Sequence, residues 1–432
     1  MGGTDATDSS YARLFRNRNY ARVFSAGLGS VAGSAVASIC LVWIVFSETR
    51  SAFDVALLGV AYIVPALLFS TLGGTLVDRY NRRRLMILAD LSRAAAMGLT
   101  VLVLASVGFN LPVILGAYGV IGAFTTLFNP SEQAVIPALV PAVDVANANG
   151  LVQSSRSTLQ FVGASLGGVL IVTAGPLWGL AVNAATFAVS ALLLTGIRIP
   201  DLAAAPRQGA PRASYFADLR EGFRWLWGAQ GFFQLTISAT FFNFCSSIVG
   251  TFLVVYATVV LHGSALVYAS LLASQVGGTA IGSLLVGRLR AARYAGKAWV
   301  VSYGVLAGSV ALALSLVPSV PVAIATLFVI GLLGGFAGTA WLTAAQLLVP
   351  TEIQGRYFGI DSLGSVVILP LSQIGGALLI GAYGTRSTYF FAAALWIVAG
   401  AVFLLPRALR ELGVRPEEAL RSRSDADGAG TP

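Results

Sequence analysis

The chain is a succession of long apolar segments separated by short polar connections. Each segment has about 20 residues or more, the length with which an α-helix crosses a hydrocarbon core of about 30 Å. The segments lack the alternating pattern of about ten residues that marks a membrane strand. The pattern therefore predicts an all-α integral membrane protein with twelve transmembrane helices. We expect the spans near 22–46, 55–77, 85–107, 111–131, 148–173, 176–197, 231–258, 264–287, 297–317, 320–345, 357–381 and 386–405.

The composition agrees with this pattern and argues against an enzyme. Of the 432 residues, 56% are hydrophobic and 10% are charged, whereas about a quarter of a soluble domain is charged. The sequence has no G-x-x-x-x-G-K-[ST] phosphate loop and no Ser-His or Cys-His arrangement. Its one histidine, His262, falls in a connection, and both cysteines fall within apolar segments. We expect no catalytic activity, no metal site and no cofactor.

The basic residues are distributed unevenly between the two sides of the predicted membrane. With the N-terminus inside, 23 of the 27 lie in cytoplasmic segments, and the exceptions are Arg50, Arg386, Arg93 and Arg156. The positive-inside rule then predicts a multi-pass protein of the inner or plasma membrane with both termini in the cytoplasm. Because the basic residues occur in every inner loop rather than on one face, the net charge of +9 does not indicate a nucleic-acid partner. We expect the lipid bilayer as the surrounding partner and a monomeric protein.

One long connection divides the chain. Residues 198–230 begin with an Ala- and Pro-rich linker and end with the amphipathic stretch YFADLREGFRWLWG, which predicts a helix at the inner membrane surface. The expected organisation is a cytoplasmic N-terminal segment (1–21), a six-helix bundle (22–197), this linker (198–230), a second six-helix bundle (231–405) and a disordered cytoplasmic tail (406–432).

The two predicted bundles resemble each other in sequence. At an offset of 209 residues, GGTLVDR at 73–79 falls on GSLLVGR at 282–288. Both bundles begin on the inside, so the repeats have the same topology. Parallel six-helix repeats with a substrate site between them suit a transporter that works by alternating access.

The segment GTLVDRYNRR, residues 74–83, matches the signature G-x-L-x-D-R-x-G-R-R between the second and third spans of the major facilitator superfamily. Asn81 replaces the second glycine, and asparagine tolerates the left-handed turn expected there. The chain thus resembles this superfamily. NPSEQAVIPALVP (129–141) and GRYFGI (355–360) resemble its bacterial drug-efflux branch, which includes macrolide and enterobactin exporters.

This resemblance implies a secondary active transporter that exports amphipathic small molecules, of the antibiotic, drug or siderophore class, by alternating access in exchange for protons. Two alternatives stay open. One is a facilitator or importer of a small metabolite, and the other is a lipid-handling membrane protein on the same scaffold.

The resemblance also implies a gating role for the signature loop. Asp78 would face the positive N-terminal end of the eleventh span and hold the two halves together on the cytoplasmic side. The loop arginines would pair with Glu132 at the inner end of the fourth span. The implied gating residues are Gly74, Asp78, Arg79, Arg82, Arg83 and Glu132.

Charged residues within the spans are costly and therefore candidates for proton coupling. Asp90 and Arg93 are three residues apart, which places them on one helical face, so a purely local ion pair is the alternative. Arg156 lies eight or nine residues into the fifth span, and Asp361 lies a turn or more into the eleventh. We hypothesise that Asp361, Asp90 or Glu132 takes up the coupling proton and that Arg156 opposes it.

The superfamily fold places spans 1, 4, 7 and 10 around the substrate cavity. Candidate lining residues on these spans and on spans 5 and 8 are Phe124, Gln160, Asn243, Gln275 and Trp341, and each of them also suits ordinary packing. The pairs Gly278/Gly282, Gly331/Gly335 and Gly29/Gly33 predict close approach of helices.

Overall fold

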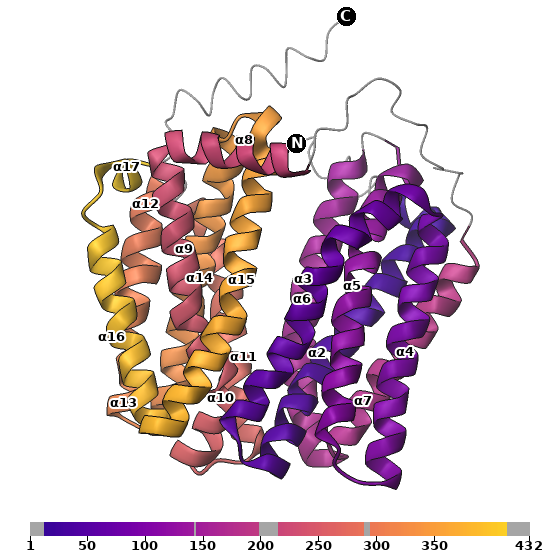
Figure 1. The fold of residues 1–432 in the computed structure, drawn as a ribbon, viewed down its shortest axis with the longest axis horizontal. Helices are drawn as coiled ribbons and strands as arrows, with labels where there is room; N and C mark the ends of the chain where they lie inside the picture. Colours follow the sequence, from indigo (N-terminus) through magenta and orange to yellow (C-terminus); the bar gives the residue numbers. More distant parts are fainter. Residues whose placement is uncertain (1–12, 142–143, 198–214, 289–293, 413–432) are drawn as a thin grey trace, which may run out of the picture. The chain divides into compact units, whose positions relative to one another are not determined.

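The structure is a computed structural model that describes residues 13–141, 144–197, 215–288 and 294–412. These residues form helices joined by short connections (Figure 1). The chain divides into two compact units, Met1–Gly209 and Ala210–Pro432.

Unit 1 contains six long helices, one for each span predicted in the first half. They are α2 (Arg18–Thr49), α3 (Ala52–Arg79), α4 (Arg82–Ser106), α5 (Leu111–Leu139), α6 (Val145–Thr173) and α7 (Pro176–Thr195). Side chains of Asn17, Ser51 and Asn110 accept backbone hydrogen bonds and cap three of them. Asn81 caps α4 by accepting from the Arg84 N–H.

Asn81 does not adopt the left-handed conformation expected at the glycine position of the loop signature. Its φ is −62° and its ψ is 114°, which is extended backbone. The N-cap position of α4 requires extended backbone and a short polar side chain, and asparagine supplies both. The replacement of glycine therefore strengthens the start of the helix.

Unit 2 builds its six spans from more segments. The first consists of α9 (Gln230–Thr251), α10 (Leu253–Val255) and the π-helical η2 (Tyr256–Val260), and the third of α12 (Ala295–Ala298), the π-helical η4 (Trp299–Leu306) and α13 (Ala307–Leu316). The others are α11 (Ala265–Arg288), α14 (Val320–Leu348), α15 (Thr351–Tyr383) and α16 (Thr385–Phe403).

The two units use the same pairing of helices. In unit 1, α3 packs on α5, α2 packs on α6 and α7, and α4 packs on α5 and α7. In unit 2, α11 packs on α14, α9 packs on α15 and α16, and α13 packs on α14 and α16. Each pair in one unit has its counterpart in the other when the spans are numbered in order, which agrees with the internal repeat found in the sequence.

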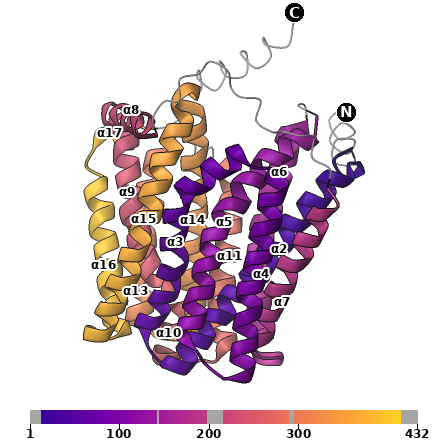
Figure 2. The same ribbon diagram turned by 45° about the vertical axis from the view of Figure 1, so that its right-hand side comes forward.

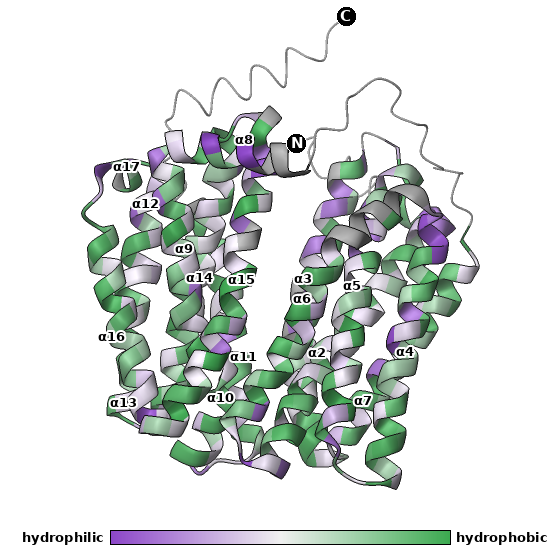
Figure 3. Ribbon diagram, viewed as in Figure 1, coloured by the Kyte–Doolittle hydropathy of each residue, from purple (hydrophilic) through white to green (hydrophobic). Residues whose placement is uncertain are grey.

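Eleven helical segments of the described chain are long and apolar enough to cross a membrane. The remaining long helix, α6, has 29 residues, but its first half is polar and includes Gln153 and Arg156. Apolar residues predominate along the helices (Figure 3), and many of them are exposed, such as Leu102 and Leu284 at 68% and 78%. Apolar surface of this extent fits contact with lipid tails.

Close approach of α11 and α14 depends on four glycines. A Cβ atom at Gly278 or Gly282 would overlap the carbonyl oxygen of Phe328 or Leu332, and a Cβ at Gly331 or Gly335 would overlap a carbonyl of α11. The predicted role of these two pairs is confirmed. Gly29 differs, because a Cβ there would meet nothing within 4 Å.

The amphipathic stretch of the linker is the helix α8 (Tyr215–Gly228), which runs crosswise at the ends of α9 and α15 (Figures 1 and 2). Glu221 forms an ion pair of 2.9 Å with Arg356 on α15. The Trp225 ring lies 5.8 Å from that of Phe232 and 6.0 Å from that of Tyr357. The preceding linker residues 198–214 lie outside the described residues.

The beginning of the predicted disordered tail is ordered, which corrects that prediction for residues 407–412. Arg407–Arg410 form the short helix α17, in which Leu409 is fully buried. The Gly296 N–H donates to the Leu412 carbonyl at 3.0 Å. Burial of the apolar Leu409 side chain explains why this segment packs on the unit. The rest of the tail lies outside the described residues.

Candidate functional site

Four charged side chains lie within the interior of unit 1. Asp90 and Arg93 are on α4, Glu132 is on α5 and Arg156 is on α6. At 1.5 Å per residue, each lies about 10–16 Å from the end of its helix. Asp90, Arg93 and Glu132 are at most 4% exposed. Charges buried this deeply are stable only with partners.

The first pair is Asp90 with Arg93. Ser190 donates a hydrogen bond of 2.5 Å to the second oxygen of Asp90. The Arg93 guanidinium lies over two aromatic rings, 4.5 Å from the centroid of Phe128 and 4.5 Å from that of Phe187. These cation–π contacts stabilise a desolvated guanidinium in addition to its carboxylate partner. The predicted local pair is therefore present and lies well inside the helix bundle.

The second pair is Glu132 with Arg156. A Cβ atom at Gly27 of α2 would overlap the Glu132 carboxylate, so the glycine provides the space that this carboxylate occupies. The loop arginines were the predicted partners of Glu132, but among the described side chains its ion-pair partner is Arg156. Glu132 lies about two turns inside the end of α5.

The loop arginines of α4 have other surroundings. Arg83 donates to the carbonyl of Leu194 at 2.9 Å and to that of Thr195, and so joins the start of α4 to the end of α7. Arg82 is half-buried. The surroundings of Gly74 and the side chains of Asp78 and Arg79 lie outside the described part of the structure, and the predicted latch by Asp78 stays a prediction.

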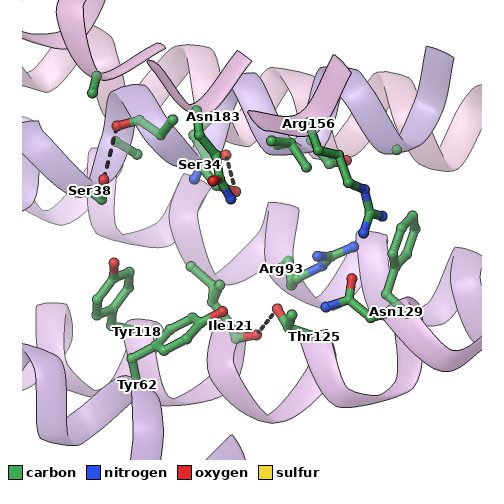
Figure 4. Close-up of a pocket in the computed structure, with 18 residues that line it drawn as sticks. Ser34, Ser38, Tyr62, Arg93, Tyr118, Ile121, Thr125, Asn129, Arg156 and Asn183 are labelled. Atoms are coloured by element: carbon green, nitrogen blue, oxygen red, sulfur yellow. Dashed lines mark hydrogen bonds between the residues drawn. The ribbon is translucent and has the colours of Figure 1, made fainter. Parts of the chain in front are cut away.

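A cavity of about 430 Å³ opens beside the two ion pairs. Figure 4 shows Arg93 and Arg156 near Asn129 at one end, and Tyr62 and Tyr118 at the other. The ring centroids of the two tyrosines are 5.1 Å apart. Six helices contribute to the lining, which further includes Ser30, Ser34, Ser38, Thr125, Gln160 and Asn183. Within unit 1, the cavity thus combines a polar end with an aromatic end.

Of the predicted cavity residues in unit 1, Gln160 lines this cavity and Phe124 does not. Phe124 packs against an apolar core to which α2, α4, α5, α6 and α7 contribute. Sequence reasoning missed Tyr62, Tyr118 and the serines of α2. The serines repeat at helical spacing, at positions 30, 34 and 38, and this polar stripe in an apolar span was the available signal.

In unit 2, Asp361 is the buried carboxylate of α15, with 7% exposure. It accepts a hydrogen bond of 3.2 Å from the Thr236 hydroxyl on α9. In the described residues we find no ion pair between Asp361 and a basic side chain. The structure therefore does not bring Asp361 into a paired cluster like the one in unit 1.

The other predicted residues of unit 2 make separate contacts. Asn243 donates to the Ser365 hydroxyl at 3.3 Å, and the Trp341 indole donates to the Tyr357 hydroxyl at 3.3 Å. Gln275 is half-buried on α11. An apolar cavity of about 380 Å³ is lined by Ile237, Thr240, Phe241, Phe244, Ile368 and Leu395, without any of these three.

The helix pairing, the apolar exterior and the buried charges define a membrane transporter of the major facilitator fold. The model of the family described as transmembrane secretion effector matches residues 8–425. The chain belongs to this family, which confirms the predicted fold and the resemblance to drug-efflux transporters. Its members are transporters, not enzymes.

Two relatives illustrate the likeness in sequence. The multidrug efflux pump Tap of Mycobacterium tuberculosis is 24% identical over 417 residues, covering 93% of this chain and 97% of Tap. Macrolide efflux protein A of Streptococcus pyogenes is 22% identical over 395 residues, covering 89% of this chain and 95% of that protein.

Solved structures share the fold at lower identity. A bacterial homologue of the human lysosomal transporter Spinster, inward-facing and unoccupied, has a TM-score of 0.70 and 17% identity, covering 93% of this chain and 99% of that one. The nucleoside transporter NupG has a TM-score of 0.70 and 12% identity, covering 89% of this chain and 97% of its own.

Proposed function

We propose that the protein is a secondary active transporter that exports amphipathic small molecules, of the antibiotic, drug or siderophore class, in exchange for protons. The observation that carries this proposal is the cavity of unit 1, with buried ion pairs at one end and two tyrosines at the other. The aromatic end offers apolar surface and the polar end offers hydrogen-bonding groups, and this combination suits an amphipathic cargo. The names of Tap and macrolide efflux protein A support the direction and class of transport.

Among the candidate carboxylates, Asp361 is the best suited to carry the coupling proton. Asp90 and Glu132 each have an arginine partner that stabilises the ionised carboxylate. Asp361 is buried with a hydroxyl as its hydrogen-bond partner. Burying a carboxylate as an ion without a cation is costly, and proton uptake removes that cost. Proton binding and release at Asp361 would thus couple to the exposure of α15 during alternating access.

The proposal includes the predicted topology and the predicted latch. The protein would lie in the bacterial inner membrane with both termini cytoplasmic, because this orientation places the basic loops inside. Asp78 would act at the cytoplasmic end as a gate between the two halves, as the signature loop implies. We further propose that it acts as a monomer.

A growth-inhibition panel tests this function. The chain is expressed in a bacterial host lacking its own efflux pumps and exposed to macrolides, tetracyclines, phenicols, dyes and iron chelates, with and without a protonophore. We expect resistance to at least one class, and its loss with the protonophore or with Asp361→Asn. Glu48→Gln, at an exposed carboxylate of α2, is the matched control and should keep the resistance. Absence of protection by protein verified in the membrane would contradict export of this cargo class and favour a metabolite transporter.

A further inference from the structure

One side of α8 (Tyr215–Gly228) packs against α15 (Figures 1 and 2). A Cβ atom at Gly222 would meet Ile360 Cδ1 at 2.8 Å and Arg356 Cβ at 3.1 Å. Ile360 comes nine residues after Thr351, the first residue of α15, which is about 14 Å at 1.5 Å per residue. Because α15 continues past this contact, α8 lies beside that helix and not on its end. The opposite side of α8 therefore faces sideways from unit 2.

Four exposed side chains form this opposite side, which we call the outer face of α8. They are Arg220, Phe223, Arg224 and Trp227. Their spacing of three or four residues places them on one side of the helix. At 3.6 residues per turn, Gly222 and Trp225 lie about 150° from the middle of this face. Phe223 is 50% exposed and Trp227 is 73% exposed, so both rings are available to a partner.

The outer face lies at the level where a membrane span begins. The Trp227 ring centroid is 4.9 Å from that of Phe233, which belongs to the first turn of α9. This helix opens the apolar span Gln230–Val260. Tryptophan is enriched where a span meets the lipid head groups, because its ring is apolar and its N–H donates hydrogen bonds. The level of the outer face and its exposed rings favour lipid as its partner.

The charge of the outer face selects the kind of lipid. Arg220 and Arg224 are one turn apart, and neither pairs with a carboxylate among the described side chains. Glu221, which lies between them in the sequence, pairs with Arg356 at 2.9 Å. A guanidinium group binds phosphate oxygens through two parallel N–H donors. An anionic phospholipid offers this phosphate without the positive group of a zwitterionic lipid, which two arginines would repel.

We infer that the outer face of α8 binds the head group of an anionic phospholipid. Arg220 and Arg224 hold the phosphate, and the rings of Phe223 and Trp227 pack in the adjoining layer of glycerol and acyl carbons. The inference goes beyond the proposed function, because it assigns a lipid site to a helix that lines neither cavity.

Photo-crosslinking at position 227 tests this inference on the full chain in nanodiscs. There p-benzoyl-phenylalanine replaces Trp227, and the bilayer is a known mixture of phosphatidylglycerol and phosphatidylcholine with identical acyl chains. Mass spectrometry gives the ratio of the two lipids in the adducts. We expect phosphatidylglycerol to be enriched about fivefold or more over its share of the bilayer, since one basic residue near an anionic lipid has an effect of this size. The same replacement of Trp178, which is 62% exposed at the start of α7, should give the bilayer ratio.

The double variant Arg220→Gln/Arg224→Gln tests which charges are responsible. Adducts at position 227 should still form, because the rings remain, but their lipid ratio should return to that of the bilayer. Arg16→Gln/Arg18→Gln is the matched control, since it removes two exposed arginines at the start of α2 and should leave the enrichment unchanged. Placing the crosslinking residue at Phe223 repeats the measurement from the neighbouring ring.

Adducts in the bilayer ratio at both positions would overturn the inference, as would enrichment that survives Arg220→Gln/Arg224→Gln. Crosslinks to protein would assign the outer face to a partner chain, and the absence of adducts would assign it to water. Either result would overturn the inference as well. The test is independent of transport: a chain that confers resistance without lipid enrichment keeps the proposed function and loses the lipid site. Enrichment without resistance would have the opposite meaning.

Discussion

The two six-helix units share their helix pairing but differ in what fills their interiors. Unit 1 buries two ion pairs, Asp90–Arg93 and Glu132–Arg156, beside a polar cavity. Unit 2 buries a series of aromatic rings, in which Trp299 and Tyr303 are 5.4 Å apart and Tyr303 and Trp396 are 5.2 Å apart. The shared pairing is set by backbone approach, whereas the interior chemistry is set by a few side chains. Two units with the same helix pairing can therefore take on different roles in one transporter.

The difference suggests which unit performs which task. In unit 1 each buried carboxylate has an arginine partner, which favours its ionised form. In unit 2 the hydrogen-bond partner of Asp361 is the Thr236 hydroxyl, which carries no charge to balance that of the carboxylate. We therefore propose that unit 1 recognises the cargo and that unit 2 carries the coupling proton.

The largest loss of stability is expected when one member of a buried ion pair is removed. Arg156→Ala leaves the Glu132 carboxylate buried without its cation, and we expect the free energy of unfolding to fall by about 3–5 kcal/mol. Denaturant unfolding in mixed micelles measures this loss. The double variant Arg156→Ala/Glu132→Gln should lose less than Arg156→Ala alone, because no unpaired charge remains. A single variant within about 1 kcal/mol of the parent would contradict the paired-charge description.

Replacing a glycine at a close helix contact by alanine tests whether both units depend on the same close approach of helices. Gly282 faces the Leu332 carbonyl in unit 2, and Gly122 faces the Tyr62 carbonyl in the corresponding helix pair of unit 1. Gly282→Ala and Gly122→Ala should each lower the free energy of unfolding by about 1–3 kcal/mol, because the facing backbone must move.

Gly98→Ala on α4 is the control for these two variants, since a Cβ there meets nothing within 4 Å. It should be neutral or slightly stabilising, as expected for alanine within a helix. A large loss at only one of Gly122 and Gly282 would show that the two units do not rely on the same close approach.

The smallest effect is expected at the surface of unit 1. Arg13 pairs with Asp144 at 3.1 Å, but its side chain is 55% exposed. Arg13→Ala should lower the free energy of unfolding by less than about 1 kcal/mol, because solvent screens the pair. The same denaturation series measures it, and a loss as large as that of Arg156→Ala would show that burial does not separate the two kinds of ion pair.

Much of the fold follows from the sequence, because apolar length is a direct requirement of the membrane. The spans, the helix at 215–228 and the close-packed glycines of α11 and α14 were predictable on this ground. The π-helical segments Tyr256–Val260 and Trp299–Leu306 were not, since their composition does not differ from that of ordinary apolar helix.

The charged residues of the candidate site were predictable from the sequence, but their arrangement was not. Asp90, Arg93 and Arg156 stand out because charges within spans are rare. The partner of Glu132 was assigned to the loop because sequence spacing gives depth along one helix but not which helix lies opposite. Tyr62 and Tyr118 were missed because an aromatic residue in a span looks the same whether it faces lipid or a cavity.

Proton flux through the purified chain in proteoliposomes tests the central assignment most directly. An internal pH-sensitive dye records proton movement when the compound with the strongest resistance phenotype is added under an imposed pH gradient. We expect cargo-dependent proton flux in the parent chain and its loss in Asp361→Asn. Undiminished cargo-dependent proton flux in Asp361→Asn would contradict the assignment of proton coupling to unit 2.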